Sequence, residues 1–209
     1  MQTFDPAQES AKNIYKLMIG TIVPRPIAFV STVDTRGVRN LAPFSYFTAV
    51  TSDPPTVLFC PALRSADPGR EILDTKDTLR NILATREFVI NIVSEEIAAE
   101  MNACSAQVPP AADEFELSGL TPVASDLVKP PRVAESPVQM ECRLRQIIAV
   151  SEKPEGGGSI VLGEVLRFHV REDMMQDFKI DPDKLRAIGR MGGPTYCRTR
   201  DRFDLQRPK

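Results

Sequence analysis

The first third of the chain is dominated by β-branched and aromatic positions that predict antiparallel strands. The run RPIAFVSTV, residues 25–33, is followed by the turn sequence DTRG and then by a second extended run over residues 38–52. The prolines of DPP, residues 53–55, stop that run because proline lacks a ladder donor and restricts the residue before it. TVLFCPAL, residues 56–63, then begins another strand. The pattern predicts a hairpin followed by a third antiparallel strand.

The middle of the chain changes to a helical period. Leu79, Ile82 and Leu83 have the spacing of one helix face. EFVINIVS, residues 87–94, predicts a strand, and EEIAAEMNACS, residues 95–105, predicts a second helix. This part of the chain is therefore expected to insert helices into a β-rich fold.

Residues 106–137 carry a dense scatter of proline and polar residues. We expect a long, ordered excursion over the surface here rather than a linker, and a loop of this length suggests a binding role. Beyond it, the sequence alternates apolar and polar positions from Val138 to Leu144, and SIVLGEVLRFHV, residues 159–170, supplies a partner strand across the turn KPEGGGS. The pattern predicts a second hairpin.

About six antiparallel strands joined by hairpins, with few helices, predict a mainly β fold. A closed or partly closed barrel is favoured because closure removes exposed strand edges. No internal repeat and no βαβ series is present, so a doubly wound sheet is the weaker alternative. With 209 residues, the chain is expected to form a single domain over residues 1–209.

Composition narrows the classes of partner. The 26 basic and 28 acidic residues are interspersed and give a formal charge of −2, so no electrostatic footprint for nucleic acid is present. Apolar runs are broken by charges well before the roughly 20 residues of a membrane helix. The N-terminal sequence lacks the plan of a signal peptide. We expect a soluble, cytoplasmic protein with no nucleic acid and no membrane partner.

Cysteine and histidine usage argues against several kinds of site. Four cysteines lie far apart without a CxxC pair, and His169 is the only histidine. Neither a zinc site nor a disulfide is predicted, and burial is the better expectation for the four thiols: Cys60, Cys104, Cys142 and Cys197. Hydrolase chemistry is disfavoured because any triad would depend on that one imidazole. A structural, hydrogen-bonded role for His169 is at least as plausible as a catalytic one.

The stretch KDTLRNI, residues 76–82, places a cation, an acid and a hydroxyl ahead of a helical pattern. Asp77 is a plausible N-cap, which would leave the amides of residues 78–80 without helical partners. Those amides, the helix dipole, the Lys76 ammonium and the Thr78 hydroxyl could together hold a phosphate.

Arg64 could add a second cation to this site if the intervening loop folds back. Taken alone, however, the stretch also fits a capped surface helix with a solvated lysine. Neither a G-x-G-x-x-G turn nor a P-loop is present, so a phosphate would have to be held in some other way.

NLAPFSYFTAV, residues 40–50, mixes polar and aromatic positions on a predicted strand. A flat heteroaromatic ligand suits this mixture, because apolar walls bury its faces while amides and hydroxyls pair along its edge. An ordinary barrel strand with an aromatic core face is the alternative. Gly192 and Gly193 in RMGGPTY allow close backbone approach between Arg190 and Tyr196, although this segment also fits a simple turn.

Eight strings taken in order resemble the flavin reductase-like family of FMN-binding split-barrel proteins: PRPIAFVSTVD, NLAPFSYFTAVTSDPP, KDTLRNI, EFVINIVS, DEFELSGLTP, PPRVAESPVQMEC, IVLGEV and RMGGPTY. The resemblance runs from about residue 12 to about residue 205. It implies a Greek-key antiparallel split barrel with flanking helices, and a homodimer with flavin sites at or near the subunit interface. It also implies FMN held without a covalent bond.

Carried onto this sequence, the resemblance assigns two groups of FMN contacts and one outlying residue. The isoalloxazine would contact Asn40, Ser45, Tyr46, Phe47 and Thr48. The phosphate would meet Lys76, Asp77, Thr78 and Arg64, with Asp77 as a cap or ribityl contact rather than a partner of the dianion. Asn102, in MNACSA, would lie near the flavin edge.

The resemblance implies an NAD(P)H-dependent FMN reductase that transfers a hydride from NADH or NADPH to flavin. Many family members pass reduced flavin to a separate monooxygenase, which makes such a component a possible partner. One alternative is a flavoenzyme that keeps its FMN and directly reduces an organic substrate such as a nitroaromatic compound. Another is a non-enzymatic FMN-binding electron carrier. No motif distinguishes NADH from NADPH.

Overall fold

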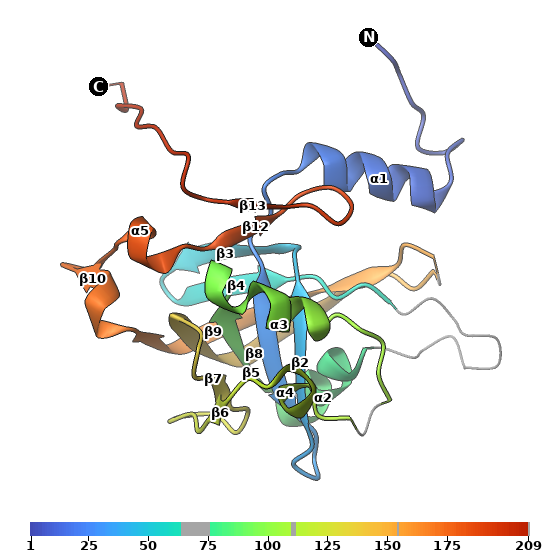
Figure 1. Cartoon of the computed structure of the whole chain (residues 1–209). Helices are drawn as coiled ribbons and strands as arrows, with labels where there is room; N and C mark the ends of the chain where they lie inside the picture. The colour runs from blue at the N-terminus through green and yellow to red at the C-terminus, as the bar shows by residue number, and fades with distance from the viewer. Residues whose placement is uncertain (64–75, 110–111, 154, 209) are drawn as a thin grey trace.

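The computed structural model describes residues 1–63, 76–109, 112–153 and 155–208 (Figure 1). Its centre is a seven-stranded antiparallel sheet in the order β2-β1-β5-β8-β9-β4-β3. The strands are β1 (Ala28–Val33), β2 (Arg39–Phe44), β3 (Phe47–Ser52), β4 (Pro55–Phe59), β5 (Glu87–Ile92), β8 (Val138–Ser151) and β9 (Gly158–Val170). The mainly β fold and both predicted hairpins are confirmed.

The prediction of one continuous strand over residues 38–52 is wrong. That run forms β2 and β3, which pair with β1 and β4 at opposite edges of the sheet. Only Ser45 and Tyr46 connect them, and the carbonyl of Tyr46 accepts a hydrogen bond of 2.9 Å from the amide of Cys60. Because two residues span so short a distance, the sheet has to curl until its edges meet. The connection thereby closes a split barrel of seven strands, one more than predicted.

Aromatic packing fills the barrel. The rings of Phe44 and Phe59 lie 5.0 Å apart, and Phe59 meets Phe88 edge-on at 5.6 Å. Both Phe59 and Phe88 are fully buried. Inward positions alternate with outward ones along β9, as a strand with one face on the core requires. Gly163 on this strand leaves room for the Phe88 ring.

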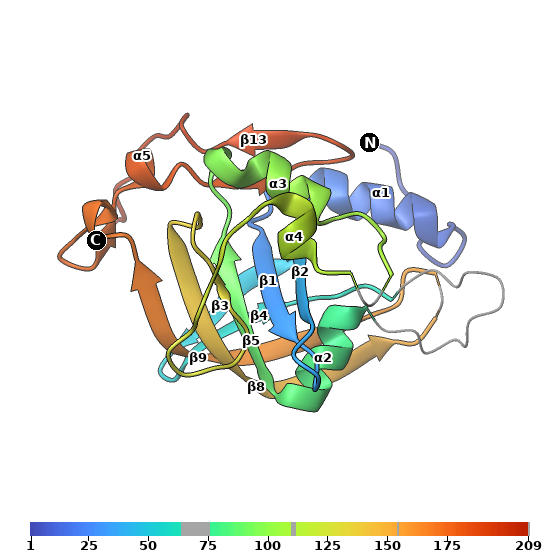
Figure 2. The ribbon, with the colours of Figure 1, turned by 60° about the horizontal axis from the view of Figure 1, so that its bottom comes forward.

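Helix α2 (Asp77–Thr85) covers β1 and β2 (Figure 2). Leu79 and Ile82 are buried as predicted, but Leu83 is 53% exposed. Polar Thr78 and Asn81 take part in the buried face instead. The buried face of the helix therefore differs from the one that the spacing of its apolar residues predicts, because it includes these two polar side chains.

The second predicted helix, residues 95–105, is divided into a 3₁₀ turn (Glu95–Ile97) and α3 (Ala98–Ala103). The predicted excursion is ordered in its described part and contains α4 (Glu114–Ser118) and a small ladder of β6 (Pro122–Val123) with β7 (Arg132–Val133). After this excursion the polypeptide returns to the sheet as strand β8.

The ends of the chain form a layer against one end of the barrel (Figures 1 and 2). The N-terminal helix α1 (Ala11–Thr21) begins at Ser10, whose hydroxyl accepts from the amide of Asn13. Short elements follow β9: a 3₁₀ turn (Glu172–Met174), β10 (Met175–Gln176), β11 (Lys179–Ile180), α5 (Pro182–Leu185), β12 (Ile188–Arg190) and β13 (Tyr196–Arg198). The RMGGPTY segment is the turn between β12 and β13. Within the described ranges, no helix is long and apolar enough to cross a membrane.

Candidate functional site

A cavity of about 280 Å³ lies between the start of α2, strand β2 and the segment of residues 104–108. Four of the residues predicted to bind a ligand line it: Asn40, Lys76, Asp77 and Thr78. Ala62 and Leu63 form another part of the wall, and Glu114 reaches it from α4. The structure thus unites the polar start of β2 with the predicted phosphate-binding stretch.

The start of α2 differs from its predicted form. Lys76 is the N-cap position and Asp77 is the first helical residue, where it forms an ion pair with Arg80. The amides of Leu79 and Arg80 donate to the Lys76 carbonyl at 2.9 and 3.2 Å. The predictions of an Asp77 cap and of unpaired amides at these two positions are therefore wrong. The helix begins one residue earlier, so its own carbonyl ladder takes those two donors.

The Lys76 ammonium lies at the rim of the barrel, 5.1 Å from the centroid of the Phe44 ring. This distance allows a cation–π contact. Because Phe44 is itself packed in the core against Phe59, the aromatic surface holds the lysine near the cavity. A positive charge fixed in this way suits an anionic ligand group.

A buried polar network forms the floor of the cavity. Thr78, which is 1% exposed, donates its hydroxyl to Oδ1 of Asn40 at 2.9 Å. Thr32 donates to the same oxygen at 3.4 Å and accepts from Nδ2 of Asn81 at 3.1 Å. The network joins α2 to β1 and β2, which explains the burial of the polar helix positions.

Glu114, which sequence reasoning did not single out, completes this network. Its Oε1 accepts from Nδ2 of Asn40 at 2.8 Å, and its Oε2 accepts from the amide of Leu41 at 3.1 Å. Burial raises the pKa of Glu114, and the charge of Asp77 adds to this, while the bonds from Asn40 and Leu41 act in the opposite direction. The only signal in the sequence was an acid at the start of a short helix in the excursion.

Ser45 and Tyr46 lie beside Arg25, a second residue missed by sequence reasoning. Nε of Arg25 is 3.4 Å from Oγ of Ser45, and its guanidinium carbon is 5.9 Å from the centroid of the Tyr46 ring. The guanidinium also donates to the carbonyls of Ile19 and Met191, at 2.7 and 3.0 Å. Arg25 therefore connects both terminal segments to the turn that closes the barrel.

The other predicted contacts lie outside the lining of this cavity. Phe47 packs against the barrel core, and Thr48 is exposed on β3. The exposed Asn102 accepts a hydrogen bond of 3.3 Å from the hydroxyl of Tyr196. That ring also lies 4.4 Å from the guanidinium carbon of Arg190 within the RMGGPTY turn. The hydrogen bond to Asn102 joins this turn to α3. Arg64 lies outside the described residues.

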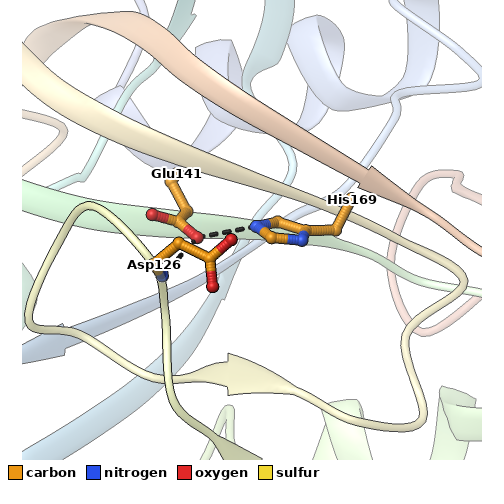
Figure 3. Close-up of side chains that lie close together, drawn as sticks. All are labelled: Asp126, Glu141 and His169. Atoms are coloured by element: carbon orange, nitrogen blue, oxygen red, sulfur yellow. Dashed lines mark hydrogen bonds and ion pairs between the residues drawn. The ribbon is translucent and has the colours of Figure 1, made fainter.

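His169 on β9 belongs to a separate cluster with Glu141 on β8 and Asp126 (Figure 3). Its Nε2 lies 2.6 Å from Oε1 of the fully buried Glu141. The two oxygens of Glu141 also accept from the amides of Asp126 and Leu127, at 2.8 and 2.6 Å. The Asp126 side chain pairs with Arg167 at 2.6 Å. These contacts anchor the excursion to β8 and β9, and they show that His169 is hydrogen-bonded.

All four cysteines carry free thiols. Cys104 and Cys142 are buried as predicted, whereas Cys60 and Cys197 are only partly covered.

A wider depression of about 780 Å³ lies between the β1–β2 turn and the excursion. None of the residues predicted to bind flavin lines it, and we place the candidate site at the smaller cavity for that reason.

Comparison with known proteins agrees with this fold. The model of the flavin reductase like domain matches residues 19–186, which is most of the chain. The chain belongs to the flavin reductase-like family. The resemblance carried by the eight sequence strings is thereby confirmed.

Solved structures of the family superpose over nearly the whole chain. Nitrilotriacetate monooxygenase component B from Bacillus cereus is 34% identical, with a TM-score of 0.90 and 98% of each chain covered. The 2-nitrobenzoate 2-nitroreductase NbaA of Pseudomonas fluorescens is 32% identical, with a TM-score of 0.85, covering 99% of this chain and 96% of that one. A Shewanella frigidimarina protein assigned as a flavin reductase with split barrel domain has a TM-score of 0.83 at 21% identity over 100% of both chains. The last similarity supports the split-barrel fold alone.

Proposed function

We propose that the protein is an NAD(P)H-dependent FMN reductase whose flavin phosphate binds at the start of α2. The observation that carries this proposal is the convergence of Lys76, Thr78 and Asn40 on one cavity of a flavin reductase-like barrel. An ammonium, a hydroxyl and a side-chain amide are suitable donors for a phosphate. These residue types can therefore serve FMN, although in this structure the Thr78 hydroxyl donates to Asn40 and the Asn40 amide donates to Glu114. The carboxylates of Asp77 and Glu114 also border the cavity.

The residues of the chain would bind and orient the cofactor. Lys76 would supply charge to the phosphate, and the Phe44 ring beneath it would limit the positions of its ammonium. The turn at Ser45 and Tyr46 would contact the ring system, and Arg25 would fix its position through its contacts with Ser45, Ile19 and Met191. When bound, FMN supplies the electron-accepting ring to which a nicotinamide delivers hydride. The protein has to supply position and hydrogen bonds rather than an acid and base pair.

We further propose that the reduced flavin serves a separate monooxygenase component. Support comes from the 34% identity to a protein named as component B of nitrilotriacetate monooxygenase. The protein would act as a homodimer of single-domain chains.

Anaerobic stopped-flow mixing with NADH and with NADPH tests the reductase activity. Rapid bleaching of the flavin absorbance is expected with at least one nicotinamide, whereas no bleaching with either would leave only an electron carrier.

Direct reduction of an organic substrate is the second candidate function. The 32% identity to a named 2-nitrobenzoate 2-nitroreductase favours it specifically. A reductase that exchanges its flavin should lose FMN during gel filtration, whereas a nitroreductase should retain it. Turnover of a nitroaromatic compound by the FMN-loaded protein, without any added oxygenase, would support this candidate over the first.

A further inference from the structure

A chain of three side chains leads from the interior to the candidate phosphate site. Thr78 donates to Asn40 at 2.9 Å, and Asn40 donates to Glu114 at 2.8 Å. Both hydrogen bonds therefore run in the same direction, from the cavity toward the carboxylate. An ionised carboxylate is an acceptor only, so it determines the orientation of the Asn40 amide and, through it, the Thr78 hydroxyl.

This direction is unfavourable for a phosphate ligand. The hydroxyl proton of Thr78 is used by Asn40, so the Thr78 oxygen presents only lone pairs to the cavity. A phosphate dianion also presents only lone pairs. In addition, the carboxyl groups of Asp77 and Glu114 both border the cavity, with Lys76 as the cation among its described lining residues. Like charges at close range disfavour the ionised state of one of them.

One proton on Glu114 would reverse the whole chain. Oε1 would then donate to Oδ1 of Asn40, while Oε2 would still accept from the amide of Leu41. The Asn40 amide would turn over and donate from Nδ2 to the oxygen of Thr78. The second hydrogen of Nδ2 would face Thr32, whose hydroxyl now donates to Oδ1 and would have to turn its proton away so that its second lone pair can accept. The Thr78 proton would become available to a ligand in the cavity.

We propose that the flavin phosphate binds together with a proton on Glu114, taken up from solvent, and that this proton makes the Thr78 hydroxyl a donor toward the phosphate. The inference rests on the proposed function, because it assumes the phosphate site at the start of α2. It assigns Glu114 as a positioning residue, which acts on the ligand through Asn40 and Thr78.

The surroundings of Glu114 support a proton at this place. Burial raises its pKa, and the negative charge of Asp77 on α2 raises it further. Arg39 directly precedes Asn40 on β2, but its guanidinium is already paired with Asp113 and Glu116, at 2.5 and 3.6 Å.

Cys104, which also lines the cavity, brings no charge to Glu114. Burial raises the pKa of the Cys104 thiol to about 11, so that neighbour stays uncharged. Lys76 supplies the positive charge that the phosphate meets first. A phosphate dianion entering the cavity adds negative charge and favours protonation of Glu114 still more.

The test compares FMN with riboflavin, which lacks the phosphate, in the wild-type protein and in Glu114→Gln. The glutamine amide can donate to Asn40 as a protonated Glu114 would, and its oxygen can accept from Leu41. Affinities are measured by flavin fluorescence between pH 7 and 9, above the ordinary second phosphate pKa of about 6. Calorimetry in two buffers of different ionisation enthalpy measures the protons taken up. This second measurement on the wild-type protein does not depend on folding of the variant.

The wild-type preference for FMN over riboflavin is expected to fall as pH rises, approaching about tenfold per pH unit once Glu114 is ionised in the free protein. Proton uptake should approach about one per FMN bound and should be absent with riboflavin. Glu114→Gln should keep its preference for FMN, independent of pH and without proton uptake. A wild-type preference that does not change with pH, or a variant that loses the preference, would overturn the inference while leaving the phosphate site intact. Equal affinity of the wild-type protein for both flavins would instead contradict the phosphate site itself.

Discussion

Nε2 of His169 on β9 lies 2.6 Å from Oε1 of Glu141 on β8, and Glu141 is fully buried. Burial by itself would raise the pKa of Glu141, but the bonds from Asp126, Leu127 and His169 lower it below its ordinary value of 4.5. A lowered pKa in the folded state means that this group stabilises the fold above pH 4.5. That contribution is lost as the pH falls through the folded-state pKa.

Glu141→Gln is therefore expected to lower the free energy of unfolding by about 2 to 4 kcal/mol at pH 7. The NH₂ group of the glutamine would replace one accepting oxygen of Glu141 and would then face a group that donates to that oxygen. The loss should shrink as the pH falls below 4.5. Urea unfolding across this range measures it. Asp126→Asn is the matched control, because its exposed carboxylate pairs with Arg167 and lies within 4.8 Å of the facing atoms of Glu141 and His169. It changes a charge in the same cluster without removing a buried acceptor, and a change of at most about 1 kcal/mol is expected. Equal losses in both variants would contradict a special role for Glu141.

Lys76→Ala is expected to weaken FMN binding by roughly 10-fold to 150-fold, because one charge-assisted interaction of about 1.5 to 3 kcal/mol is removed. Riboflavin should bind the wild-type protein and the variant about equally. Titration of both flavins against both proteins forms a double-mutant cycle between the lysine and the phosphate. If the variant lost affinity for riboflavin as strongly as for FMN, Lys76 would not be a phosphate ligand.

Arg25→Lys is expected to destabilise the protein by about 3 kcal/mol or more. Arg25 is 5% exposed and reaches the carbonyls of Ile19, Ile22 and Met191 with one planar group. A lysine ammonium does not reproduce that fork, so buried carbonyls would lose their donors. Urea unfolding measures the loss. Arg36→Lys, whose side chain is 73% exposed, should change stability by less than about 0.5 kcal/mol.

Gly163→Ala and Gly20→Ala should have opposite effects on stability. A Cβ at Gly163 would overlap the ring of Phe88 and lie 2.9 Å from its Cε1, which overpacks the core at a cost of about 1 to 3 kcal/mol. A Cβ at Gly20 in α1 would meet nothing within 4 Å. Alanine there should stabilise the helix by up to about 1 kcal/mol. Thermal unfolding compares the two, and a stabilised Gly163→Ala variant would show that the barrel tolerates a larger residue.

Sedimentation velocity is expected to show a dimer. Tyr15, Met18 and Ile22 form a stripe along α1 and are 55%, 42% and 55% exposed in the single chain. A subunit interface over this stripe would cover it, and Met18→Asp should then shift the equilibrium toward monomer. Leu83→Asp, at a 53% exposed position of α2, serves as the control. A stable monomer that binds FMN at full strength would contradict the dimer.

The sequence by itself determined most of the local structure. Strand and turn chemistry predicted both hairpins, because alternation and turn residues act over a few neighbouring positions. KDTLRNI predicted α2 for the same reason, to within one residue of its observed start. The family resemblance extended this to the split barrel and to a flavin as the ligand, both of which agree with the comparisons.

Only the tertiary structure decided which distant groups meet. Residues 38–52 look like one strand because their pattern is continuous, yet barrel closure bends the chain at Ser45 and Tyr46. Glu114 lies 74 residues beyond Asn40, and its carboxylate defines the floor of the cavity by reaching that amide. Arg25 likewise becomes a central contact only when the chain ends pack together. Local pattern carries no information on such pairings, because burial and hydrogen-bond direction depend on packing between segments that are remote in sequence.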